Sequence, residues 1–173
     1  GFLRQFTNGD FRFVYWGPAG STTSLHSDVL NSFSWSFNVA GVKEWEFHID
    51  NRTISLRQEA GELIFVPSTI KHSVMNVQET LSINHNWITT ANLDLVWECL
   101  ETEMGAVEAE LEAWNMLGDY EARENMLRGC VGLNVTSFLF MMLVRGLTLL
   151  ADSDKFSSWQ DDFDLVRLRD VVS

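Results

Sequence analysis

Two histidines and one aspartate stand at a spacing that favours metal binding. His26 and Asp28 are separated by a single residue. On an extended backbone, side chains at positions i and i+2 point to the same face, so both can reach one point. His72, in the strand-like segment 71–76, supplies a second imidazole. Two histidines and one carboxylate occupy one face of a divalent metal and leave about three positions open, as in non-haem Fe(II) oxygenases.

The segments around these residues have the alternation of β-strands. Residues 32–39 alternate small polar with large apolar side chains, a period of two that indicates a half-buried strand. Residues 80–87 alternate in the same way, and one face carries Thr80, Ser82, Asn84 and Asn86. These polar faces either contact solvent or line a pocket, and the pattern alone leaves both open. Because buried amides need hydrogen-bond partners, an asparagine pair beside a metal histidine suits a polar ligand inside a barrel.

The order of the expected elements predicts a mainly β fold with α-helices. Strands are expected near residues 11–16, 21–27, 32–39, 43–50, 53–57, 61–66, 71–77 and 80–88. Eight strands are what a double-stranded β-helix, a jelly-roll or cupin-like barrel, needs. From Asn92 the apolar spacing changes to three and four, which predicts helices over 92–114, 120–128 and 134–150, with a short one over 161–172.

We therefore predict two domains. Residues 1–90 form the catalytic β-core, whose N-terminal flanking elements are expected to be missing, and residues 91–173 form a helical extension that packs on the core or forms an interface. Apolar residues nearly all round the helix expected at 134–150 suggest that it is buried or meets a partner.

Charge and composition limit the partners. The net charge is −12, from 24 acidic and 12 basic residues. This disfavours nucleic acid, because phosphate contacts require clusters of lysine and arginine, and it favours a basic protein segment. No apolar run is long enough for a membrane helix, so no membrane partner is expected. Cys99 and Cys130 are too few for a disulfide framework and fit a cytoplasmic or nuclear protein.

Four blocks of sequence carry a specific resemblance. They are VYWGPAGSTTSLHSD, SFSWSFNVAGVKEW, GELIFVPSTIKH and ETLSINHNW, which together span residues 14–87. In this order they resemble the JmjC class of 2-oxoglutarate- and Fe(II)-dependent oxygenases. The resemblance implies a JmjC double-stranded β-helix barrel in which His26, Asp28 and His72 hold Fe(II) and form the catalytic centre.

The resemblance also implies a 2-oxoglutarate site. Family residues that bind the distal carboxylate of 2-oxoglutarate map onto Lys43 and Thr23, and other polar pocket positions map onto Ser36, Asn84 and Asn86. A lysine in an apolar pocket can meet that carboxylate as a point charge. Ascorbate would be a supporting reductant.

The function implied is a protein hydroxylase, specifically lysyl C-hydroxylation of a translation termination factor in the cytoplasm, with O2 consumed and succinate and CO2 released. Helices after the barrel form homodimers in several related hydroxylases, and here a homodimer or an intramolecular cover stays open. The alternatives are an N-methyl-lysine demethylase, a non-catalytic cupin-like binding module and a metal-dependent cupin isomerase. Demethylase relatives more often have Glu at the position of Asp28, and the isomerase would not need Lys43.

Overall fold

The computed structural model describes residues 12–151 and Arg167. Within these residues the chain forms two compact units, one of residues 12–87 and one that begins at Ile88. The first is built of strands and the second of helices. The helix expected over 161–172 lies, apart from Arg167, outside the described residues.

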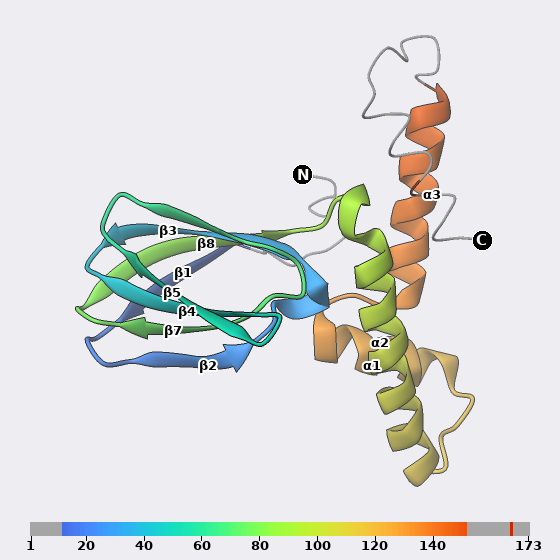
Figure 1. The fold of residues 1–173 in the computed structure, drawn as a ribbon. Helices are drawn as coiled ribbons and strands as arrows, with labels where there is room; N and C mark the ends of the chain where they lie inside the picture. Colours follow the sequence, from blue (N-terminus) through green and yellow to red (C-terminus); the bar gives the residue numbers. More distant parts are fainter. Residues whose placement is uncertain (1–11, 152–166, 168–173) are drawn as a thin grey trace. The chain divides into compact units, whose positions relative to one another are not determined.

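Eight strands make the first unit, and each lies within two residues of its expected bounds. They are β1 (Arg12–Gly17), β2 (Thr22–His26), β3 (Phe33–Ala40), β4 (Lys43–Ile49), β5 (Arg52–Gln58), β6 (Leu63–Val66), β7 (Lys71–Asn76) and β8 (Thr80–Trp87). They form two antiparallel four-stranded sheets with the orders β1-β8-β3-β6 and β2-β7-β4-β5 (Figure 1). Apart from the β4–β5 hairpin, strands that follow one another lie in different sheets. The predicted jelly-roll, cupin-like barrel is therefore confirmed.

The polar faces of the alternating strands point into the barrel. Ser34 and Ser36 of β3 and Ser82 of β8 are each at most 5% exposed, whereas Leu63 and Phe65 of β6 are 58% and 50% exposed. The sheet β1-β8-β3-β6 thus places polar groups inside and apolar groups outside, the reverse of the usual arrangement. The opposite sheet supplies the apolar part of the interior through Trp45 and Phe47, which pack with Val66.

The second unit contains three α-helices, as expected. They are α1 (Leu93–Ala113), α2 (Tyr120–Val131) and α3 (Val135–Ala151), and a 3-10 turn, η3 (Thr90–Asn92), precedes α1. The side chain of Asn92 does not cap α1: it accepts from the backbone N–H of Thr89 and completes a capping box around η3. Asn134 does cap α3, because its Oδ1 accepts from the backbone N–H of Ser137 at 2.9 Å.

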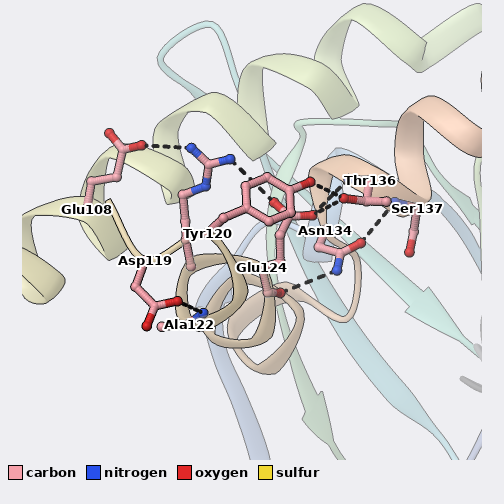
Figure 2. A network of polar contacts seen from close by, with 9 residues as sticks. Glu108, Asp119, Tyr120, Ala122, Glu124, Asn134, Thr136 and Ser137 are labelled. Atoms are coloured by element: carbon pink, nitrogen blue, oxygen red, sulfur yellow. Dashed lines mark hydrogen bonds and ion pairs between the residues drawn. The ribbon is translucent and has the colours of Figure 1, made fainter. Parts of the chain in front are cut away.

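A buried carboxylate ties α2 to the start of α3. Glu124 of α2 is 5% exposed, and its Oε2 accepts from the backbone N–H of Thr136 at 2.9 Å and from the hydroxyl of Thr136 at 2.6 Å (Figure 2). The amide of Asn134 donates to the backbone carbonyl of Glu124. A carboxylate at a helix N-terminus satisfies unpaired backbone donors and complements the helix dipole.

The third helix is less buried than its composition indicates. Phe138 and Met141 are fully buried, but Leu139, Leu143 and Leu147 form an exposed stripe at a spacing of four residues. Of the two expectations for this helix, burial holds for the face of Phe138 and Met141 only, and a partner surface stays a prediction for the exposed stripe. Among the described helices none alone has the length and hydropathy to cross a membrane, and α2 and α3 meet that test only as a pair bent by 80°.

Candidate metal centre

The structure brings the three expected ligands together inside the barrel. One ligand atom from each of His26, Asp28 and His72 lies within 4.8 Å of the other two. The imidazole rings of His26 and His72 have their centroids 4.4 Å apart. His72 is buried, and the other two residues are partly buried. Three donors at this separation can converge on a single cation.

Backbone carbonyls fix the orientation of both imidazoles. Nδ1 of His26 lies 2.8 Å from the carbonyl oxygen of Ser24, and Nδ1 of His72 lies 3.1 Å from that of Ile70. A carbonyl oxygen only accepts hydrogen bonds, so each Nδ1 donates, and in the neutral form of each ring the lone pair is on Nε2, where a metal can bind. Histidine ligands of protein metal sites are held in this way by a hydrogen bond from the second ring nitrogen.

A bulge in β2 decides which side chains of that strand enter the barrel. Thr23 pairs with Val74, and His26 pairs directly with His72, so the register shifts by one residue between Thr23 and His26. Residues three apart on a regular strand face opposite sides, but the extra residue of a bulge restores both to one side. Thr23 and His26 consequently line the same cavity.

Burial sets the protonation of two groups in the site. Burial lowers the pKa of His72, which favours the neutral imidazole that a metal requires. On β1, the phenol of Tyr15 also lines the cavity, and its pKa is raised by burial and then by the negative charge of Asp28. The described residues around the triad therefore favour a neutral imidazole and a neutral phenol.

A lysine ammonium lies inside the same cavity. Lys43 is 5% exposed, and its Nζ donates to the hydroxyl of Ser82 at 2.7 Å. Within the described residues no carboxylate is within ion-pair distance of this nitrogen. Burial lowers the pKa of Lys43 because the charged form is poorly solvated there. An anionic ligand would supply the missing countercharge.

The cavity has a volume of about 360 Å³, within the range of small-molecule sites. Of the residues expected around the cosubstrate, Thr23, Lys43, Asn84 and Asn86 line it. Ser36 is not among its lining residues. It is fully buried and donates from its hydroxyl to Oδ1 of Asn84 at 3.1 Å, so it orients that amide from behind.

Several residues of the site were not singled out by the sequence. Ser34 donates to Oδ2 of Asp28 at 2.6 Å, and Trp45 stacks on His72 with ring centroids 5.7 Å apart. Gln58 is fully buried, accepts from Nε1 of Trp45 and donates to the carbonyl of Ser36, and so joins the two sheets. The alternation of residues 32–39 indicated that Ser34 shares a face with Ser36 of β3, but not which residue of another segment it contacts.

The donor set fits a divalent transition metal. Two neutral imidazoles and one carboxylate suit iron, and a face of three protein ligands leaves positions for a chelating cosubstrate. The nearby ammonium fits the far carboxylate of a dicarboxylic acid. The residues present therefore fit both groups that the resemblance implied.

Curated proteins match this chain over most of its length. The protein named 2-oxoglutarate and iron-dependent oxygenase JMJD4 is 34% identical in Danio rerio, over 75% of this chain and 39% of that protein. The Homo sapiens protein of the same name is 32% identical over 95% of this chain and 50% of its own length. A protein of Arabidopsis thaliana named arginine-specific demethylase JMJ20 is 36% identical over 80% of this chain and 37% of that protein. These similarities agree with the JmjC resemblance of the sequence blocks.

The chain spans about half or less of the length of these JmjC relatives. No family model matches the sequence. Among solved structures, the CENP-C cupin domain of Drosophila melanogaster is 9% identical, with a TM-score of 0.41 over 44% of this chain and 60% of that chain. The matched span of the JmjC relatives includes the whole barrel in the human case, because the alignment covers nearly the full chain.

Proposed function

We propose that this chain contains the catalytic core of an Fe(II)- and 2-oxoglutarate-dependent protein hydroxylase. The observation that carries the proposal is the buried ammonium of Lys43 in the same cavity as His26, Asp28 and His72. A metal site alone would fit many cupin-like proteins, including an isomerase. A desolvated cation beside it, with no ion-pair partner in the described residues, favours a cosubstrate with a second carboxylate.

The proposed roles follow from the geometry. Nε2 of His26, Nε2 of His72 and the carboxylate of Asp28 would hold Fe(II), and Lys43 would bind the distal carboxylate of 2-oxoglutarate. When bound, iron and 2-oxoglutarate supply the oxidation of a C–H bond by O2, with release of succinate and CO2. The barrel orients the cosubstrate through Thr23 and Asn84 on its wall.

For the substrate, we propose a lysine side chain of a protein, with a translation termination factor as the leading candidate. The net charge of −12 would attract a basic protein segment and repel nucleic acid. Both cysteines are free thiols, which supports a cytoplasmic location, with the nucleus as the second compartment. A homodimer through the helical unit is also proposed, because α3 leaves an apolar stripe exposed.

Demethylation is the second candidate. It is favoured by the names of two relatives, the arginine-specific demethylase JMJ20 and the bifunctional arginine demethylase and lysyl-hydroxylase psr-1 of Caenorhabditis elegans. Both reactions would use the same metal and cosubstrate site. Hydroxylation of an N-methyl group breaks the C–N bond and releases formaldehyde, whereas hydroxylation of a side-chain carbon retains the oxygen in the product.

The deciding experiment begins with anaerobic binding of Fe(II) and then 2-oxoglutarate to the purified protein. Peptides that carry unmodified lysine, methyl-lysine or methyl-arginine are next incubated with O2, and products are analysed by mass spectrometry and formaldehyde release. Addition of one oxygen to unmodified lysine, without formaldehyde, is expected. Release of formaldehyde from a methylated peptide, with no oxygen added to unmodified lysine, would contradict the proposed hydroxylase activity and favour the demethylase.

A further inference from the structure

Of the three candidate metal ligands, Asp28 is the one that does not lie on a β-strand. β2 ends at His26, and Asp28 lies two residues further, just before the 3-10 turn η2 (Val29–Asn31). Its backbone is extended, with φ −61° and ψ 146°, and its side chain makes no capping hydrogen bond to that turn. The backbone after it turns sharply, since Leu30 has a φ of 56°. Local structure therefore places Asp28 near the site but does not fix its carboxylate.

Ser34 supplies the missing restraint. Its hydroxyl donates to Oδ2 of Asp28 at 2.6 Å, a length typical of a strong hydrogen bond to a carboxylate. Ser34 is 5% exposed and lies on β3, which is paired on both sides, with Asn86 of β8 and Val66 of β6 as its neighbours. The donor is thus attached to a central strand with little freedom to move.

The two serines next to Ser34 on the same face, Ser36 of β3 and Ser32 directly before that strand, have different partners. Ser36 donates to the amide of Asn84, and Ser32 accepts from the amide of Asn86, so both bond to the adjacent strand β8. Ser34, on the same face, instead bonds to a metal-ligand carboxylate outside the sheet. Removal of any one of the three hydroxyls deletes a buried hydrogen bond, but only one of these bonds ends on the triad.

We infer that Ser34 is a positioning residue of the metal centre, which holds Oδ2 of Asp28 so that Oδ1 alone is presented to the cation. This inference rests on the metal site of the proposed function. A tethered carboxylate binds through one oxygen and leaves more of the metal's positions open to a chelating cosubstrate. Without this hydrogen bond, the carboxylate of Asp28 would lose conformational freedom when the metal binds, which weakens binding. Both of its oxygens would also be free to contact the cation.

Four variants test this role with Co(II) as the probe, in the full chain and without O2 or 2-oxoglutarate. Ser34→Ala removes the hydroxyl. Ser34→Thr and Ser34→Val have nearly the same shape and differ in whether a hydroxyl is present, so they control for volume and for folding. Ser32→Ala removes a buried hydroxyl from the residue directly before β3, and this hydroxyl bonds to Asn86 and not to Asp28. Co(II) affinity is measured by calorimetry, ligand geometry by the visible spectrum, and folding by circular dichroism.

Loss of a hydrogen bond to a metal ligand typically lowers metal affinity by about 10–100-fold. We expect Ser34→Ala and Ser34→Val to bind Co(II) at least tenfold more weakly, with an altered visible spectrum, and Ser34→Thr and Ser32→Ala to bind as the wild type does. Equal affinity and spectra for the Thr and Val variants would overturn the role of Ser34. The same holds if Ser32→Ala weakens binding as much. A wild-type protein that binds no metal would overturn the proposed function as well, so the two failures are distinguishable.

Discussion

At the scale of the residue, the interior of the barrel is unusual because it keeps charged and polar groups away from water. Lys43, His72 and the serines of β3 are buried, and each has a polar partner that lowers the cost of its burial. Burial of such a set of polar groups costs folding free energy that an apolar interior would avoid. It is what a site for a cation and an anionic cosubstrate requires, and its parts can be tested separately.

The metal ligands are the first test. His26→Ala, Asp28→Ala and His72→Ala should each abolish 2-oxoglutarate turnover and lower Fe(II) affinity by several kcal/mol, since apparent metal-binding free energies of protein sites reach about 10 kcal/mol or more. Anaerobic iron binding and succinate release measure both effects. His48→Ala is the matched control, because His48 is an exposed histidine on β4. Wild-type iron affinity and turnover in any triad variant would remove that residue from the ligand set.

Lys43→Met is the second test. It keeps an unbranched side chain but removes the ammonium, and loss of one partner of a buried charge pair costs about 2–5 kcal/mol. The apparent KM for 2-oxoglutarate should therefore rise by about two orders of magnitude or more, while Fe(II) affinity changes little. Steady-state kinetics and anaerobic metal titration measure the two quantities. An unchanged KM would exclude the carboxylate role and favour a cupin isomerase.

At the scale of the element, turns and bulges decide how the strands present these residues. The β4–β5 hairpin turns through Asp50 and Asn51, both with positive φ, as two-residue hairpins with the favoured twist require. The β3–β4 connection turns at Gly41, with a φ of 81°, and places Lys43 at the start of β4. A shift of this turn would move Lys43. Gly41 therefore matters both for the fold of the turn and for the position of the lysine.

Gly41→Ala should destabilise the barrel more than Gly61→Ala does. Both glycines have positive φ, which costs an alanine about 1–2 kcal/mol. A Cβ at Gly41 would also lie 2.0 Å from the backbone carbonyl oxygen of Glu79, whereas nothing lies within 4 Å of a Cβ at Gly61. Overpacking adds about 1–3 kcal/mol. Denaturant unfolding followed by the β-sheet signal measures the difference, and equal losses would contradict the steric argument.

In the helical unit, the carboxylate of Glu124 should be a main source of stability for the α2–α3 junction. Glu124→Ala removes the acceptor of two hydrogen bonds from Thr136, and hydrogen bonds to charged groups contribute about 1.5–3 kcal/mol. A loss of about 2–3 kcal/mol in the unfolding free energy of the helices is expected. Glu121→Ala, at an exposed position on the same helix, should change it by less than about 0.5 kcal/mol. Similar losses for both would show that the buried network adds nothing.

At the scale of the whole molecule, charge is the property that acts over distance. Acidic residues outnumber basic residues by 24 to 12, and many of them lie on α1 and α2. A cationic protein substrate would be drawn to such a surface before any specific contact forms. Surface attraction of this kind is screened over about 8 Å at physiological ionic strength.

The kcat/KM for a basic protein substrate should therefore fall as salt rises, by about tenfold between low and high ionic strength, since steering raises association rates by about 10–10³. The kcat at saturating substrate should change little. A neutral peptide with the same target lysine serves as the control and should show no salt dependence. If salt leaves kcat/KM unchanged for both substrates, the acidic surface serves solubility alone.

The strands, the helices and the residue types of the site could be predicted from the amino-acid sequence. Alternation with a period of two is a local property, and it located β3 and β8, while apolar runs and turn residues indicated other strands of the barrel. The spacing of His26 and Asp28, and the JmjC resemblance in the case of Lys43, marked residues that the structure then brought into one cavity. These features depend on the backbone within a few residues, so the chain displays them before it folds.

Which face of each strand lies inside the barrel, and which side chains contact one another, depends on how distant segments pack together. The inward direction of Ser34 and Ser82 depends on a second sheet that closes the barrel, and a one-residue register shift between Thr23 and His26 changes the face of every side chain beyond it. The partners Asp28 and Lys43 of these serines come from other strands and turns. A periodic pattern in the sequence cannot predict such contacts, because the contacting residues are far apart in the sequence and lie in different segments.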